Sequence, residues 1–334
     1  MILAGDVGGT KSHLALFTIK GGKLSPVVER TLSSQDYSGL EDMTRAFLDQ
    51  ATSREPSVTI EQISSACFGV AGPVVEDRCE TPNLPWVITA ERLREVLGLE
   101  AVKLINDLEA TGYGIPCLGT EEFITLNKGS LRQKGNGALI AAGTGLGEAM
   151  LYWDGTDFIP MASEGGHADF APRNALEIEL LYYLLDRLTR VSYERLVSGP
   201  GLFNIYSFLR DAGYGEEPAW LTEKLQQDDP SAAIGKAALA NQNGLCVKAL
   251  DMLVSIYGAE AGNLALKVMA VGGVFVGGGI APKIIEKLRD GTFMRAFTDK
   301  GRLSPVLEAI PVRVILNPKT ALYGAARRAT MLQK

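Results

Sequence analysis

The sequence predicts an α/β protein of two similar domains, each built on a mixed β-sheet flanked by helices. Its 334 residues are too many for one small core and about right for two domains. A pattern of two apolar strands around a glycine-rich turn occurs twice, and each copy is followed by a strand that runs into another glycine turn. The 37 glycines cluster beside these apolar runs, which indicates tight turns and close approach of the backbone to a ligand.

The repeated hairpins set the expected organisation of the chain. The first covers Ile2–Phe17 and the second Ala138–Trp153, and the two align without gaps at an offset of 136 residues. The strands that follow them, at Ala66–Val74 and Val271–Pro282, each end in glycines and a proline. We therefore expect duplication of a hairpin-plus-α/β unit, and two domains that face each other.

The remaining elements fit this plan. Apolar spacing predicts two further short strands and five helices. Asn317-Pro318 is expected to interrupt the regular structure before the last helix. The strands are Val102–Ile105 and Val312–Leu316, and the helices are Glu41–Ala51, Ala90–Leu97, Leu176–Leu188, Ala232–Tyr257 and Thr320–Leu332. We expect the first domain to cover residues 1–108, completed by the C-terminal helix 320–334, and the second to cover residues 109–319.

Composition argues against several classes of protein. The net charge is −6 and no run of Lys or Arg stands out, so we expect no nucleic-acid partner. The four cysteines are scattered and form no CxxC pair. We therefore expect neither a disulfide framework nor a structural zinc site. The N-terminus lacks a basic leader, unlike a signal peptide. The apolar stretch Leu264–Pro282 is too broken by Lys267 and glycines to span a membrane, so we expect no membrane association and a cytoplasmic protein.

Two glycine-rich segments imitate nucleotide-binding motifs without matching them. Gly5–Ser12 fits a P-loop except at Thr10, where that motif requires glycine. A P-loop also opens a helix, whereas His13–Phe17 is apolar and continues as a strand. Gly143–Gly147 is not a GxGxxG fingerprint, and it too precedes a strand-like run. P-loop and Rossmann folds are therefore excluded.

What remains is a pair of hairpin turns suited to phosphate. The first presents the amides of Gly8, Gly9 and Thr10, with Asp6 at the strand end behind a Mg²⁺ ion. Either turn alone is also explained as an ordinary glycine-rich β-turn. Two such turns, one in each domain, can hold one triphosphate between them.

Polar residues gather in two other places. His13 lies on a predicted strand and is expected to be structural, whereas His167 lies in the polar, glycine-rich segment Ser163–Asp169 with two carboxylates. Asn106 and Asp107 end the strand at Val102–Ile105, so Asp107 is expected at a helix N-terminus. Helix capping alone also explains this pair.

Taken in order, these motifs resemble the bacterial ATP-dependent glucokinases of the hexokinase/actin superfamily, the group typified by the enterobacterial enzymes. The resemblance extends over essentially the whole chain. It is carried by Asp6–Thr10, Leu104–Asp107, Ala142–Gly147, Ser163–Asp169, Tyr193–Arg195, Ser198–Gly201 and Gly277–Ile280. It implies two actin-like (ribonuclease H-like) domains with the active site in the cleft between them, and a homodimer.

The resemblance also implies roles for individual residues. Asp107 takes the proton from the 6-hydroxyl of D-glucose as it attacks the γ-phosphate of ATP, which gives glucose 6-phosphate and ADP. The ring hydroxyls are bound by Asn106, Asp107, Glu164, His167 and Glu194. ATP and Mg²⁺ are bound by Asp6, Gly8, Gly9, Thr10, Lys11, Gly143, Thr144, Gly145, Gly277, Gly278 and Gly279, with Asp6 on Mg²⁺ through water. These residue types suit a sugar, whose hydroxyls both donate and accept.

Other functions are compatible with parts of the pattern. A related kinase for fructose, mannose or N-acetylglucosamine is the nearest alternative, but its family usually carries a cysteine-rich zinc motif, and residues 168–201 contain no cysteine. A second alternative is a non-catalytic sugar sensor on the same fold. A sensor that acts as a repressor would need a DNA-binding segment, and we expect no room for one before the first strand. A chaperone-type ATPase leaves the sugar-binding residues unexplained. Polyphosphate stays open as an alternative donor.

Overall fold

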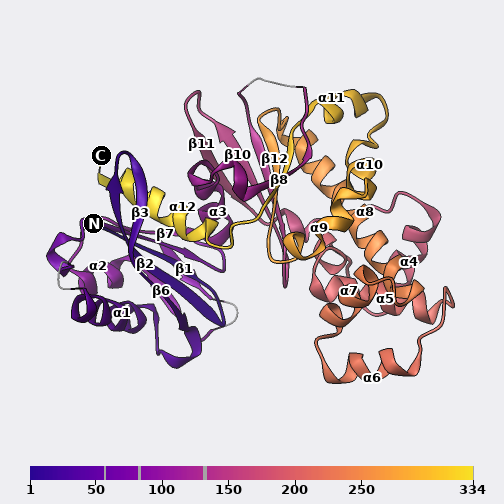
Figure 1. The fold of residues 1–334 in the computed structure, drawn as a ribbon, viewed down its shortest axis with the longest axis horizontal. Coiled ribbons are helices and arrows are strands. Elements are labelled where there is room, and N and C mark those ends of the chain that lie inside the picture. Colours follow the sequence, from indigo (N-terminus) through magenta and orange to yellow (C-terminus); the bar gives the residue numbers. More distant parts are fainter. Residues whose placement is uncertain (56–57, 82–83, 131–133, 334) are drawn as a thin grey trace. The chain divides into compact units, whose positions relative to one another are not determined.

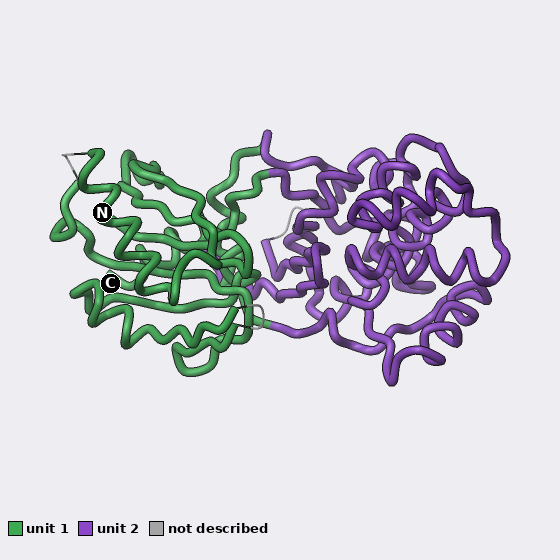
Figure 2. Tube along the Cα trace, turned by 90° about the horizontal axis from the view of Figure 1, so that it is seen from below, with its two compact units in different colours: residues 1–120, 158–162, 317–334 green, residues 121–157, 163–316 purple. Residues whose placement is uncertain are grey.

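The computed structural model describes residues 1–55, 58–81, 84–130 and 134–333 (Figure 1). The chain divides into two compact units, which Figure 2 colours green and purple. Unit 1 consists of Met1–Thr120, Phe158–Ala162 and Asn317–Lys334, and unit 2 of Glu121–Asp157 and Ser163–Leu316. The C-terminal segment thus returns to the unit in which the chain begins.

Unit 1 contains a five-stranded sheet in the order β3-β2-β1-β4-β7. β1 pairs antiparallel with β2 and parallel with β4, and β4 pairs parallel with β7. A separate two-stranded ribbon is formed by β5 and β6. The strands are β1 (Ile2–Val7), β2 (Lys11–Lys20), β3 (Lys23–Ser33), β4 (Ser65–Val70), β5 (Arg78–Glu80), β6 (Val87–Thr89) and β7 (Val102–Asn106).

Helices cover both faces of this sheet. α1 (Leu40–Arg54) and α2 (Ala90–Leu97) share a core with Leu3, whereas α3 (Asp107–Gly114) and α12 (Thr320–Thr330) share a second core with Ile2 and Ala4. Successive side chains of a strand point to opposite faces. The first strand therefore begins with three consecutive apolar residues, Ile2 to Ala4, because both of its faces are buried.

α3 and α12 pack unusually closely. A Cβ atom added at Gly324 would lie 1.7 Å from the carbonyl oxygen of Ala110, and one at Gly114 would lie 2.0 Å from that of Thr320. Both positions therefore require glycine, and they lock the C-terminal helix against the helix that starts at Asp107.

Unit 2 is built on a six-stranded sheet in the order β11-β10-β9-β12-β13-β8. β9 pairs antiparallel with β10 and parallel with β12, and β12 pairs parallel with β13. The strands are β8 (Phe123–Asn127), β9 (Gly137–Ala142), β10 (Leu146–Trp153), β11 (Phe158–Ser163), β12 (Gly273–Gly277) and β13 (Val312–Ile315).

The helices of unit 2 gather around the long α8, which is buried along most of its length. The buried hydroxyl of Tyr257 in α8 donates to the carbonyl of Ile140 at 3.3 Å and accepts from the amide of Ala142 at 3.3 Å, which ties the helix to β9. The helices are α4 (Ala175–Leu185), α5 (Gly199–Asp211), α6 (Ala219–Gln227), α7 (Pro230–Leu239), α8 (Gly244–Val268), α9 (Ile285–Arg289), α10 (Thr292–Thr298) and α11 (Ser304–Ala309).

The predicted α/β class with mixed sheets is confirmed, and so is the internal repeat. In each unit a hairpin is extended by two parallel strands, β1-β4-β7 in the first and β9-β12-β13 in the second. The gap-free alignment of the hairpins is wrong, however. Val7 pairs with Ser12 across a four-residue turn, whereas Ala142 pairs with Leu146 across a three-residue turn.

One predicted helix is also wrong. Ala232–Tyr257 is not continuous, because α7 ends at Leu239 and α8 begins at Gly244. Asn241 in the break has a φ of 51°, in the left-handed region, and Asn243 caps α8 through its side chain. Among the described residues, no helix combines the length and apolar character that crossing a membrane requires.

Candidate functional site

Three strands of unit 1 end side by side, next to the predicted catalytic residue. Val7 of β1 is paired with Val70 of β4, and Val70 with Asn106 of β7. Ligand sites of α/β proteins lie at such carboxyl ends of parallel strands. Asp6 and Asp107, which are 101 positions apart in the sequence, therefore lie at the same edge of the sheet.

The turn after β1 is held by serines as well as by glycines. The amide of Gly8 donates to the carbonyl of Lys11 at 3.2 Å, and the Ser34 hydroxyl donates to the carbonyl of Gly8 at 2.7 Å. A buried contact of 2.9 Å joins the hydroxyls of Ser34 and Ser12. Because the amide of Gly8 already donates a hydrogen bond within the turn, a phosphate would have to be bound by the amides of the residues that follow Gly8.

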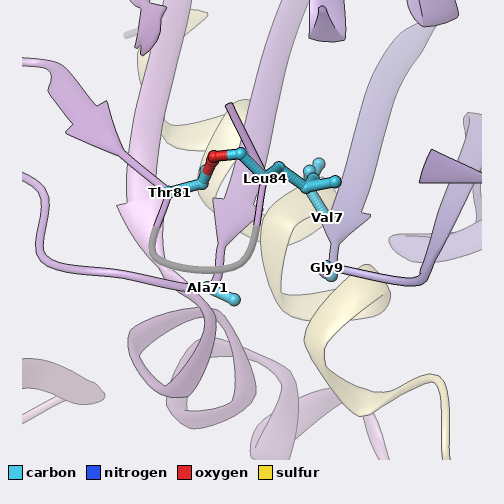
Figure 3. A pocket seen from close by; sticks show the side chains of 6 residues that line it. Val7, Gly9, Ala71, Thr81 and Leu84 are labelled. Atoms are coloured by element: carbon cyan, nitrogen blue, oxygen red, sulfur yellow. The ribbon is translucent and has the colours of Figure 1, made fainter. Parts of the chain in front are cut away.

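A small hollow opens beside this turn (Figure 3). Its wall consists mostly of backbone and small side chains. It is lined by Val7, Gly8, Gly9, Ala71, Thr81 and Leu84. The hollow thus lies between the carboxyl ends of β1 and β4 and the loop that follows β5.

Asn106 and Asp107 begin helix α3, as predicted. The Asn106 side-chain oxygen accepts from the amides of Leu108 at 2.9 Å and Glu109 at 3.4 Å, and Glu109 accepts from the Asn106 amide in return. This is a capping box. The Asn106 side-chain nitrogen donates to the carbonyl of Gly72 at 3.1 Å, which ties the helix start to the segment after β4. Helix capping therefore accounts for Asn106 in this structure, and its second amide hydrogen is the group left for a sugar.

The two aspartates of this edge affect each other. Burial, and then the negative charge of Asp107, raises the pKa of Asp6 to about 7. A divalent cation bound here together with phosphates would relieve this repulsion. Among the described residues, no three acidic, His or Cys side chains are grouped so that they could hold a metal ion. Mg²⁺ is usually held by one or two carboxylates and substrate phosphates.

The corresponding turn of unit 2 is packed against a carboxylate. The amide of Gly143 donates to the carbonyl of Gly145 at 2.8 Å, and the Glu194 carboxylate accepts from the amide of Leu146 at 3.0 Å. A Cβ atom at Gly145 would lie 2.4 Å from an oxygen of Glu194. The predicted phosphate turn and a predicted sugar ligand are therefore in direct contact, which the sequence did not reveal.

Gly278 adjoins the same turn. Its φ is +82°, which favours glycine, and an added Cβ atom would lie 2.3 Å from the carbonyl oxygen of Ala142. The amide of Ile280 donates to that same carbonyl at 3.1 Å. The glycines at 277–279 thus lie beside the end of β9, next to the Gly143–Gly145 turn.

Three predicted sugar ligands meet around His167. Its Nε2 lies 3.9 Å from a carboxylate oxygen of Glu164, and its Nδ1 lies 3.8 Å from one of Glu194. Glu164 and His167 flank one 3-10 turn (Gly165–His167), and Glu194 lies in another (Tyr193–Arg195). The Tyr193 amide donates to the carbonyl of Ala168 at 3.0 Å and so joins the two turns. The side chains of Glu164 and His167 are more than half exposed, and that of Glu194 is 27% exposed. They are therefore accessible to a ligand.

Two residues that the sequence analysis missed support this cluster. Arg190 donates to the carbonyl of His167, and to the carboxylate of Asp169 at 2.5 Å. Glu148 of β10 is buried with one oxygen close to Gly165. Arg190 follows α4 without any recognisable motif, and Glu148 occupies a strand position that carries no signal of burial.

Comparison with known proteins supports a single family. A sequence model of the family described as "Glucokinase" matches residues 3–332. The chain belongs to the glucokinase family. A glucokinase from Trichormus variabilis is 43% identical to it over 346 aligned residues, covering 99% of each protein.

Solved structures of glucokinases share its fold. A glucokinase from an Antarctic psychrotroph has a TM-score of 0.85 and 27% identity, covering 99% of this chain and 98% of that one. A ROK-family glucokinase from Streptomyces griseus, solved in complex with glucose and AMPPNP, has a TM-score of 0.65 and 20% identity, covering 99% of both chains. The two-unit α/β architecture is therefore that of the sugar kinases, as predicted.

Proposed function

We propose that this protein is an ATP-dependent glucokinase, which transfers the γ-phosphoryl group of ATP to the 6-hydroxyl of D-glucose. The observation that carries the proposal is the cluster of Glu164, His167 and Glu194, in which each carboxylate has an oxygen within 4 Å of the imidazole. A pyranose presents hydroxyls that both donate and accept, and carboxylates with an imidazole complement them. Family membership supports the assignment to glucose.

Asp107 is the proposed general base. It is the first residue of helix α3, and its carboxylate accepts from the amide of Leu108 at 2.8 Å. The positive end of the helix dipole favours the ionised carboxylate that a base requires. Asn106 would position this aspartate through the capping box and offer its remaining amide hydrogen to the sugar.

The phosphates are assigned to the two hairpin turns. Gly9, Thr10 and Lys11 of the first turn and Gly143–Gly145 of the second would hold them, while Gly277–Gly279 would lie by the adenosine. Asp6 is the proposed carboxylate for Mg²⁺, held through water. Bound Mg²⁺ neutralises the charge that develops on the transferring phosphoryl group.

The residues proposed here belong to two different units. We propose that the active site is the cleft between the two domains. The first extends to Thr120 and does not end at residue 108 as expected from the sequence, because helix α3 packs on α12 within unit 1. Closure upon glucose binding would exclude water and prevent hydrolysis of ATP. The enzyme is proposed to be a cytoplasmic homodimer.

A coupled assay of ADP release over a panel of hexoses tests the function. With ATP as donor we expect glucose to give the highest kcat/KM, ahead of mannose, fructose and N-acetylglucosamine. Highest activity on another hexose would contradict the assignment to glucose, and ADP release independent of sugar would contradict a kinase altogether. A parallel series with polyphosphate, followed by formation of sugar phosphate, tests the alternative donor, for which no turnover is expected.

Substitutions in the His167 cluster should separate sugar binding from nucleotide binding. Glu164→Gln and His167→Ala are each expected to raise the glucose KM tenfold or more, since a hydrogen bond to a charged group is worth about 1.5–3 kcal/mol. The KM for ATP should change much less. Steady-state kinetics with each substrate varied in turn measure both constants. Glu179→Gln, at an exposed carboxylate on α4, is the control and should leave both unchanged, while equal effects of Glu164→Gln on the two constants would argue against sugar contact.

A further inference from the structure

Glu148 and Glu260 are two of the carboxyl groups buried in the interior of unit 2, and neither belongs to the residues assigned so far. Glu148 of β10 is 2% exposed, and Glu260 of α8 is fully buried. Burial of a carboxylate is costly unless other groups compensate its charge. Both side chains connect to the two turns that carry Glu164, His167 and Glu194.

Glu260 is compensated by several partners. It accepts from the Asn263 side chain at 2.8 Å and from the Lys267 ammonium at 3.3 Å, and the same Asn263 side chain donates to the hydroxyl of Tyr193 at 3.2 Å. The Lys300 ammonium donates to Asn263 at 2.6 Å and adds a second positive charge nearby. Since Tyr193 immediately precedes Glu194, this network fixes one side of the sugar-binding cluster.

Glu148 supports the other side. One of its carboxylate oxygens lies so close to Gly165 that an added Cβ atom would be 2.2 Å away. Gly165 lies between Glu164 and His167 in the first 3-10 turn. The other oxygen of Glu148 is buried without a hydrogen-bond partner. Because a buried carboxylate with an unpartnered oxygen is costly, this position disfavours the charged form of the side chain.

The charged groups around Glu148 also disfavour its ionised form. Burial, and then the negative charge of Glu260, raises the pKa of Glu148 to about 7, and Lys267 opposes the shift. Tyr257, the other titratable group of α8 in this region, has its pKa raised by burial and by Glu148. Burial lowers the pKa of Lys300. Glu148 thus passes from neutral to charged around pH 7.

We propose that Glu148 is a positioning residue for the sugar: its buried carboxyl group, packed against Gly165, holds Glu164 and His167 in the arrangement that binds glucose. This inference rests on the proposed function. Ionisation of Glu148 would place a second negative charge beside Glu260 and disturb the turn through Gly165. Glucose affinity should therefore fall as the pH rises through 7, while the affinity for ATP should not follow.

Kinetics of Glu148→Gln and Glu148→Ala between pH 6 and pH 9 test this proposal. At pH 6, Glu148→Gln should keep the glucose KM within about threefold of the wild type, while Glu148→Ala should raise it about tenfold with little change in the ATP KM. Between pH 6 and pH 9 the glucose KM of the wild type should rise severalfold, and that of Glu148→Gln should stay flat. The flat profile distinguishes positioning by a neutral carboxyl from a general effect on folding.

Two results would overturn the inference. One is a wild-type enzyme and a Glu148→Gln variant with the same pH dependence of the glucose KM. The other is a Glu148→Ala variant whose two KM values rise equally, or, if that variant does not fold, a Glu148→Gln variant whose glucose KM is already raised tenfold at pH 6. A wild-type protein that phosphorylates no glucose would instead overturn the proposed function, and the inference with it.

Discussion

Asp107→Asn is expected to lower kcat by a factor of about 10²–10⁴, the usual contribution of a general base. The glucose KM should stay within about an order of magnitude of the wild type. Asparagine keeps the size of the side chain and an oxygen that can accept from the Leu108 amide, but it cannot take the proton of the attacking hydroxyl. Steady-state kinetics, with glucose binding followed separately by calorimetry, measure the two effects.

The matched control lies two residues further along the same helical turn. Glu109→Gln makes the same change from carboxylate to amide, and glutamine can replace glutamate in the capping box. Its kcat should stay within a few-fold of the wild type. If Asp107→Asn retained near-normal kcat, or if both variants lost activity equally, Asp107 would not be the base.

Gly324→Ala is expected to destabilise unit 1 by about 3 kcal/mol, toward the upper end of the range for overpacked sites. The new methyl group would lie 1.7 Å from the carbonyl oxygen of Ala110. Backbone cannot rotate away as a flexible side chain can, so α12 would have to move off α3. Denaturant unfolding, monitored by circular dichroism, should show a lower midpoint for this variant.

A second glycine-to-alanine change provides the control. Gly235 also lies within a helix, α7, but the nearest atom to an added Cβ is 4.0 Å away. Gly235→Ala should therefore stabilise the protein, by up to about 1 kcal/mol, because alanine favours the helix more than glycine does. A Gly324→Ala variant as stable as the wild type would show that α12 does not pack on α3 as described.

The elements with strong apolar patterns were predictable from the sequence. α2 has the predicted bounds, and β7 ends at Asn106 because that residue caps the next helix. The break between α7 and α8 was missed although the sequence carries signals for it: Asn241 tolerates the left-handed backbone found there, and Asn243 before Gly244 is a helix cap. The three-residue turn of the second hairpin was also missed, since glycines can be aligned in more than one register.

The sequence predicted which residues belong to the candidate site, but it did not predict which of them are in contact. Local sequence identified Glu164 and His167 as one polar segment, but the contact of Glu194 with the Leu146 amide joins segments 48 positions apart. Glu148 escaped detection because a single glutamate in a strand is normally taken to face solvent. Its burial arises in part from the turn at Gly165 packing against β10, which only the folded chain brings together.

The most direct test of the central claim is identification of the product by phosphorus NMR after incubation of the protein with ATP, Mg²⁺ and glucose. We expect glucose 6-phosphate and ADP in equal amounts, and no release of inorganic phosphate when glucose is left out. Formation of inorganic phosphate without a sugar phosphate, or of a phosphate ester at a hydroxyl other than position 6, would contradict the proposal that Asp107 activates the 6-hydroxyl of glucose.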